Sequence, residues 1–146
     1  METRFNLLET LPQAHGPLIE LDRMLARSGL DKIQKEMIKI RASQINGCAY
    51  CLNIHTKDAL KYGELPQRIF VMSAWREAPN WFSEADQVIL QLTEEVTMIS
   101  RHGVCDELFD KAVTLFGKET TAYIILAIVS INAWNRLGVA FSLHPQ

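Results

Sequence analysis

The chain has 146 residues, of which 48% are hydrophobic and 22% are charged, and its formal net charge is −2. Such a composition is typical of one globular domain with a sizeable core, and the charge gives no indication of nucleic-acid binding. The longest apolar run, at 122–129, is too short to cross a bilayer, and the N-terminus lacks the pattern of a secretory signal. We therefore expect a single cytoplasmic domain that binds neither nucleic acid nor a membrane.

The predicted elements are all helices. Residues 1–16 carry Pro12 and Gly16 without a sustained period, so we expect an irregular N-terminal arm there. Beyond it, apolar residues recur at helical spacing in segments separated by glycine and proline. The expected helices cover residues 17–28, 31–46, 48–62, 67–77, 83–102, 106–116 and 120–137.

Local signals support several of these boundaries. Asp31 and Ser83 each begin a sequence with capping-box spacing. The turn dipeptide at 46–47, Asn-Gly, ends one helix directly before the next. No segment alternates at period two between turn signals, and the β-branched cluster at 123–131 is too long for an ordinary strand. The sequence therefore predicts an all-α, single-domain bundle of about seven helices.

The segment 36–59 concentrates the chemically active side chains. Cys48 and Cys51 are separated by two residues, and His55 follows four residues after the second cysteine. In a reducing compartment such a pair is expected to be catalytic or metal-binding rather than a structural disulfide. Cys48 falls at a helix start, where backbone amides stabilise a thiolate, whereas Cys51 lies one turn from a histidine that can take its proton. The two observations favour different cysteines as the first nucleophile.

Glu36 can be placed relative to these residues by counting from the turn. If the helices on either side of 46–47 pack antiparallel, Glu36 lies roughly 15 Å from the turn and His55 roughly 12 Å, at 1.5 Å per residue. The carboxylate is then level with the imidazole and not with the cysteines. This placement predicts a relay in which Glu36 orients and charges His55, and His55 serves Cys51.

Other interpretations of the cysteine pair stay open. A thioredoxin fold is disfavoured because its motif follows a strand, whereas the flanks here are helical. Cys48, Cys51 and His55 offer three zinc ligands, but no second CxxC or HxxxH supplies a fourth. Cysteines are also common as small buried hydrophobic residues, and Glu36 lies beside lysines as on a solvated helix face. A non-catalytic zinc-binding or interaction module is therefore the alternative from another functional class.

Glu36, Cys48, Cys51 and His55, at spacings of 12, 3 and 4, resemble the active-site pattern of the alkyl hydroperoxidase D (AhpD)-like proteins in the carboxymuconolactone decarboxylase superfamily. The resemblance covers about residues 24–99, including KIRASQINGCAYCLNIHTKDA and SAWREAPNWFSEADQVILQLTEEVT. It implies an all-helical fold, a homo-oligomer such as a trimer or hexamer, and a cysteine pair that reduces peroxides. Tyr50 departs from the pattern, because many members carry a second histidine at this position. The resemblance therefore does not imply a relay through two histidines.

Together, the motif and the resemblance predict a thiol-dependent peroxidase or disulfide reductase that acts on alkyl hydroperoxides in antioxidant defence. Cys51 is expected to attack the peroxide and Cys48 to close the disulfide, without a metal or another cofactor. A partner dithiol, of the lipoyl type or in a thioredoxin-like protein, would then restore the pair. The enzymatic alternative is a decarboxylase-like reaction on a cyclic lactone acid, which would not depend on the cysteines.

Overall fold

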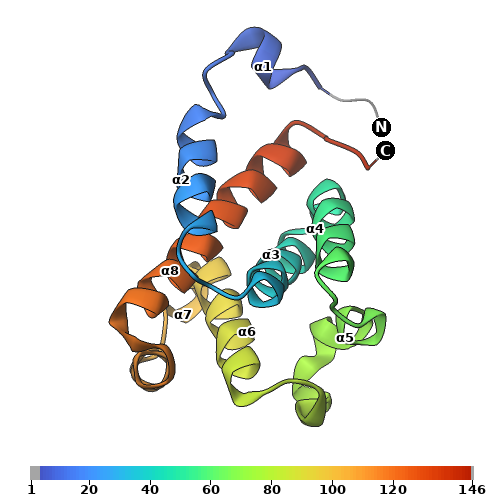
Figure 1. Ribbon diagram of the computed structural model, residues 1–146. Coiled ribbons are helices and arrows are strands. Elements are labelled where there is room, and N and C mark those ends of the chain that lie inside the picture. Colours follow the sequence, from blue (N-terminus) through green and yellow to red (C-terminus); the bar gives the residue numbers. More distant parts are fainter. Residues whose placement is uncertain (1–3, 146) are drawn as a thin grey trace.

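The computed structural model describes residues 4–145 (Figure 1). Within that range the chain forms eight α-helices and two 3-10 helices and no strand, so the all-α prediction is confirmed. The elements are α1 (Leu7–Thr10), α2 (Gly16–Ala26), α3 (Lys32–Asn46), α4 (Ala49–Lys61), α5 (Pro66–Val71), η1 (Met72–Glu77), η2 (Pro79–Trp81), α6 (Glu84–Thr97), α7 (Ile99–His102) and α8 (Asp106–Ala140).

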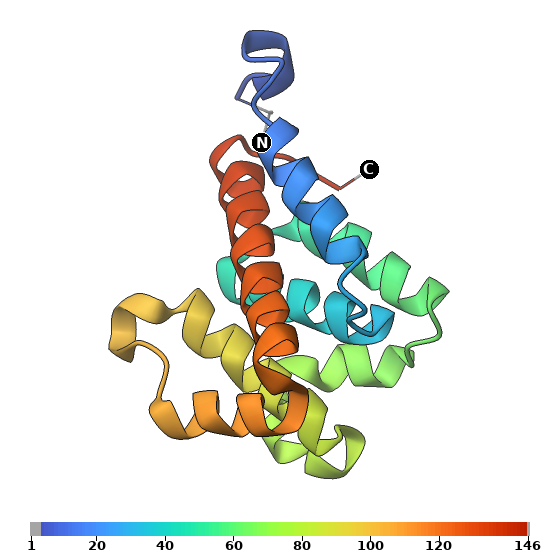
Figure 2. The same ribbon diagram turned by 60° about the vertical axis from the view of Figure 1, so that its left-hand side comes forward.

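Helix α3 lies at the centre of the bundle and packs against α4, α6 and α8. Its neighbouring residues Met37 and Ile38 are both fully buried, but they belong to different apolar clusters. Ile38 joins residues of α2, α6 and α8, whereas Met37 joins residues of α4, α5, η1 and α6. Helix α2 runs alongside α8, as Figure 2 shows. A helix apolar on two sides thus connects both halves of the core.

The turn between α3 and α4 produces the hairpin that carries the cysteine motif. Helix α3 ends at Asn46, and Gly47 follows with a left-handed φ of 67°, a conformation that glycine adopts without steric cost. Cys48 is the N-cap of α4. The predicted boundaries around this turn are therefore confirmed.

Two predicted segments differ from the structure. The arm at 1–16 is not irregular throughout, because the Asn6 side chain accepts the N–H of Leu8 and caps the short helix α1. The predicted helix at 67–77 changes from α5 to the 3-10 helix η1, in which Ala74 has non-helical angles (φ −119°, ψ 29°). Both differences arise from local backbone geometry that apolar periodicity does not report.

The long helix predicted at 83–102 is also divided. Its capping box is confirmed, since Ser83 and Asp86 bond to each other's backbone N–H, but α6 ends at Thr97. Met98 then has non-helical angles (φ −103°, ψ 34°), and α7 follows as a separate short helix. The helix therefore already breaks at Met98, whereas the sequence predicts that it continues to Gly103.

Helix α8 joins the two helices predicted at 106–116 and 120–137. Gly117 interrupts it with φ 79° and ψ 164°, so the predicted break is confirmed, and the helix continues to Ala140. By length and composition alone α8 is apolar enough to span a membrane. However, it packs against α2, α3 and α6 and carries the fully buried Asn135. These contacts place one face of α8 in the core of the bundle.

Candidate active site

Cys48 and Cys51 form a disulfide at the start of α4, with a Cα–Cα distance of 5.4 Å. Both residues are buried. The sulfur of Cys48 accepts a hydrogen bond from the backbone N–H of Cys51 at 3.3 Å. A backbone donor at a helix N-terminus stabilises negative charge on a sulfur. The prediction that the pair lies at the helix start within disulfide reach is confirmed.

Glu36 and His55 are in direct contact across the α3–α4 hairpin. The Nδ1–H of His55 donates to Oε2 of Glu36 at 2.8 Å, and Nζ of Lys39 donates to Oε1 at 2.8 Å. The predicted level placement of carboxylate and imidazole is therefore confirmed. Burial acts to raise the pKa of Glu36, but the hydrogen bonds and positive charge of His55 and Lys39 outweigh it and lower that pKa. An ionised Glu36 thus orients the ring and leaves Nε2 to exchange a proton.

A cavity of about 560 Å³ opens between α2, the α3–α4 hairpin and the C-terminal part of α8. Cys51, His55 and Glu36 line it, whereas Cys48 does not. Among the described residues no hydrogen bond joins His55 to either sulfur. His55 and Cys51 instead share this cavity, because both residues line it. Tyr50 also lines the cavity and therefore forms part of its wall. Much of the remaining lining is apolar, including Leu25, Ala26, Ile54, Ala127 and Ile131.

The backbone of α8 approaches the disulfide at Gly138. A β-carbon at this position would lie 2.9 Å from Sγ of Cys48 and 3.5 Å from Sγ of Cys51. The first distance is shorter than a β-carbon tolerates without movement of its neighbour. Gly138 thus allows helix and disulfide to pack closely, a role that the analysis of the sequence missed. The available signal was an isolated glycine inside an apolar helical pattern.

The wall made by α2 and α8 contains a second group that sequence reasoning missed. Asp22 accepts a hydrogen bond from the Ser130 hydroxyl at 2.6 Å and another from Nε1 of Trp134 at 2.9 Å. The His15 ring packs edge-on against Trp134, with ring centroids 4.9 Å apart. All four residues line the cavity. Because more than 100 positions separate Asp22 from its partners, no spacing rule could have grouped them.

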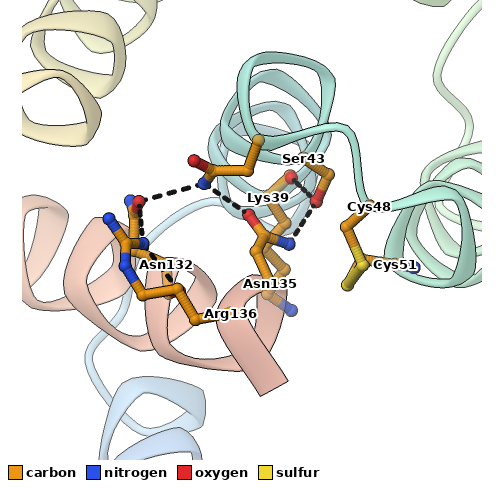
Figure 3. The surroundings of a disulfide bond; sticks show 8 residues. Lys39, Ser43, Cys48, Cys51, Asn132, Asn135 and Arg136 are labelled. Atoms are coloured by element: carbon orange, nitrogen blue, oxygen red, sulfur yellow. Dashed lines mark hydrogen bonds between the residues drawn. A yellow bond between two sulfur atoms is a disulfide. The ribbon is translucent and has the colours of Figure 1, made fainter. Parts of the chain in front are cut away.

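A buried set of polar side chains connects α8 to the cysteine turn (Figure 3). Asn135 donates to the Ser43 hydroxyl at 2.9 Å and accepts from Asn46 at 2.9 Å. The Ser43 hydroxyl donates to the carbonyl of Lys39, and the Ser43 carbonyl accepts the N–H of Cys48 at 3.0 Å. Buried amides that satisfy one another in this way fix a local geometry. The network therefore holds the first turn of α4 against α8.

Metal ligation has two candidate sets. In the set that the sequence suggests, both sulfurs belong to the disulfide, so zinc binding would require the reduced pair. In the second set, the ligand atoms of Glu36, His55 and Asp58 lie within 4.8 Å of one another. The Lys39 ammonium already occupies one oxygen of Glu36, and its positive charge opposes a cation there. Either set would have to give up a bond or contact seen in this structure before it could hold a cation.

Comparison with known proteins identifies the family. The model of the carboxymuconolactone decarboxylase family matches residues 17–95, a range that includes Glu36, both cysteines and His55. The chain is also 35% identical over 140 residues to the uncharacterized protein YdfG of Bacillus subtilis (strain 168), covering 96% of this chain and 95% of that protein. The chain belongs to the carboxymuconolactone decarboxylase family.

Solved structures narrow this assignment. A protein of unknown function from Agrobacterium tumefaciens, proposed to be an antioxidant defence protein AhpD, is 36% identical, with a TM-score of 0.94 over 99% of both chains. The AhpD core of an uncharacterized peroxidase-related protein from Ralstonia eutropha JMP134 shares the fold at 20% identity, with a TM-score of 0.79 over 95% of this chain and 74% of that chain. Within the family the chain is an AhpD-like member, and the predicted resemblance is confirmed.

Proposed function

We propose that this protein is a thiol-dependent peroxidase that reduces alkyl hydroperoxides through Cys48 and Cys51. The observation that carries the proposal is the cavity, which is lined both by one cysteine of a CxxC disulfide and by a histidine held by a buried carboxylate. A mostly apolar cavity with few convergent polar groups suits the alkyl part of such a substrate. Antioxidant defence in the cytoplasm is the setting in which we expect this activity.

The peroxide step begins at Cys51, because this residue lines the cavity and Cys48 does not. His55 takes the Cys51 thiol proton through a water molecule. The thiolate attacks the terminal peroxide oxygen, the O–O bond breaks, and the alkoxide leaves as the alcohol after receiving that proton. Cys51 is now a sulfenic acid. Cys48 attacks its sulfur, the S–O bond breaks, and the hydroxyl group leaves as water once the Cys48 proton has joined it.

The reductive step also begins at Cys51. A thiolate of the reductant attacks its sulfur, and Cys48 departs as a thiolate that the Cys51 backbone N–H stabilises. The second thiol of the reductant then releases Cys51. Overall, one hydroperoxide and one dithiol give an alcohol, water and the oxidised reductant. A lipoyl-type group and a thioredoxin-like protein are the two kinds of reductant that we expect.

Peroxide titration of the fully reduced protein tests this mechanism. We expect the loss of two thiols per peroxide and a disulfide between Cys48 and Cys51. Cys48→Ser should stop at a trappable sulfenic acid, Cys51→Ser should not react, and Cys105→Ser should behave as the parent. Cys105 is the matched control because it is the free, exposed cysteine. If peroxide left the thiols of the CxxC pair intact, the proposal would be wrong.

The alternatives make different predictions for the same variants. A decarboxylase-like activity on a cyclic lactone acid would survive loss of both cysteines. A zinc-binding module would take up one zinc ion per reduced CxxC pair and show no peroxide turnover. Turnover assays and a zinc titration of the reduced parent therefore separate the three functions.

A further inference from the structure

Three lysines line the cavity along α3: Lys32, Lys35 and Lys39. Their spacing of three and four residues puts them on one face of the helix. Lys39 forms an ion pair with Glu36 at 2.8 Å. Among the described residues, neither Lys32 nor Lys35 has a carboxylate within ion-pair distance. Two of the three positive charges are thus left for a ligand.

Lys32 and Lys35 bring positive charge to the start of α3. Lys32 is the first residue of α3 and Lys35 lies in its first turn, where the backbone amides already carry partial positive charge. The Lys32 ammonium lies 5.5 Å from the centre of the Tyr62 ring, and Nζ of Lys35 is 3.5 Å from the carbonyl oxygen of Leu25. Burial is the largest cause that lowers the pKa of Lys35, and the charges of Lys39 and Lys32 add to it, whereas the carboxylates of Glu36 and Asp31 oppose it. A bound anion would offset the positive charge that Lys32, Lys35 and Lys39 bring to this side of the cavity.

Lys32 and the reactive sulfur lie toward different ends of the cavity. Cys51 lies in the first turn of α4, whereas Tyr62, beside Lys32, follows the last residue of that helix. The eleven steps along the chain from Cys51 to Tyr62 correspond to about 16 Å along the helix. Ile54 and Leu25 contribute apolar lining to the same cavity. A ligand that reaches both ends therefore needs an apolar body between its reactive group and its anionic group.

We propose that the cavity selects alkyl hydroperoxides that carry a carboxylate at a distance from the peroxide, as fatty-acid hydroperoxides do. The carboxylate binds Lys32 and Lys35, the hydrocarbon chain follows the apolar wall, and the peroxide reaches Cys51. The two acidic side chains that line the cavity, Asp22 and Glu36, already accept hydrogen bonds from protein donors. This inference rests on the proposed peroxidase function and adds the substrate class.

Kinetics with matched substrates test the proposal. The probes are linoleic acid hydroperoxide, its methyl ester and cumene hydroperoxide, each below its micellar concentration at neutral pH with a saturating dithiol. For the parent we expect kcat/KM to be at least about tenfold higher for the acid than for the ester. Lys32→Gln combined with Lys35→Gln should raise KM for the acid by about tenfold or more and leave kcat for both neutral substrates within about twofold. Lys57→Gln, an exposed lysine on α4 outside the cavity, should match the parent.

Binding of a carboxylate that carries no peroxide tests the lysine site independently of the proposed peroxidase function. Calorimetry with decanoate and methyl decanoate on the oxidised protein should show decanoate binding that the double variant loses and Lys57→Gln keeps. Equal turnover of acid and ester by an active parent would overturn the carboxylate site and leave the peroxidase intact. Absence of turnover with every hydroperoxide would overturn the proposed function, and decanoate binding would then decide the lysine site independently.

Discussion

Gly138 of α8 lies so close to Cys48 that a β-carbon on the glycine would be 2.9 Å from the sulfur. The C-terminal part of α8 is therefore a surface against which the disulfide packs. Any side chain at this position must displace Cys48 or the helix, because a close-packed protein interior has no free space for the added atoms.

Gly138→Ala should consequently destabilise the oxidised protein. Overpacking typically costs about 1–3 kcal/mol, which exceeds the gain of up to about 1 kcal/mol from the better helix propensity of alanine. Urea unfolding of the oxidised protein measures the change. Gly16→Ala is the control, because a β-carbon there would meet no atom within 4 Å. A Gly138→Ala protein as stable as the parent would contradict the close packing.

The contact between Glu36 and His55 leads to a second prediction. Glu36→Gln should shift the pH profile of Cys51 alkylation to higher pH in a Cys48→Ser background, because a neutral amide stabilises the imidazolium less and the thiolate forms less readily. His55→Ala should shift the profile further, since it removes the proton acceptor. The rate of iodoacetamide labelling between about pH 5 and pH 10 gives both values.

The double variant of Glu36 and His55 tests whether the two act in series. Its profile should be close to that of His55→Ala, since a carboxylate acting through the imidazole has no effect once the imidazole is gone. Simple addition of the two shifts would show instead that Glu36 reaches the sulfur by a path that bypasses His55.

Asn135 provides a third prediction, on stability. Replacing it with alanine leaves the Ser43 hydroxyl and the Asn46 amide without their buried partner. The free energy of unfolding should fall by about 1–3 kcal/mol. Asn80→Ala, at an exposed position in η2, is the matched control and should change stability by less than about 0.5 kcal/mol. Thermal unfolding of both variants at one pH measures these changes in stability. Equal losses of stability in the two variants would contradict the structural role of Asn135.

Glu94 predicts how stability depends on pH. Burial acts to raise its pKa, but hydrogen bonds from Trp75, Arg76 and Arg41 outweigh burial and lower it. A carboxylate whose pKa is lower in the folded state stabilises the protein above its unfolded pKa of about 4.3, and this contribution is lost as the pH falls through the folded value.

Glu94→Gln should therefore be less stable than the parent at pH 7, by about 1–3 kcal/mol, and the gap should narrow in acid. Denaturant unfolding from pH 7 down to pH 3 measures this convergence. The control is Glu77→Gln, which changes an exposed carboxylate at the end of η1. A gap that stayed constant with pH would show that Glu94 contributes through packing rather than through its charge.

The exposed apolar side chains support a fifth prediction, a homo-oligomer such as a trimer or hexamer. Phe70 and Leu65, near α5, are 74% and 60% exposed, and Ile99 in α7 is 58% exposed. Large exposed apolar residues that cluster on a surface mark interaction sites. Light scattering at micromolar concentration should give a multiple of the 16.6 kDa chain mass, and a monomer mass would contradict the prediction.

Residues close along the chain were enough to predict the hairpin and the placement of its candidate site residues. The turn at 46–47 and the cap at Cys48 are local signals, and the constant rise of an α-helix places Glu36 beside His55 once a short turn joins the two helices. The 3-10 geometry of η1 and the break at Met98 were not predictable in this way, because apolar periodicity does not report the φ and ψ angles of single residues.

The rest of the cavity depends on contacts between distant segments. Asp22 meets Ser130 and Trp134 across more than 100 residues, and Gly138 meets Cys48 only because α8 packs along α3. Which faces of two remote helices touch is decided by how the whole core fills its volume, and no spacing within either helix contains that information. The sequence thus predicted the candidate reactive residues, whereas tertiary packing decided which cysteine lines the cavity and which side chains surround it.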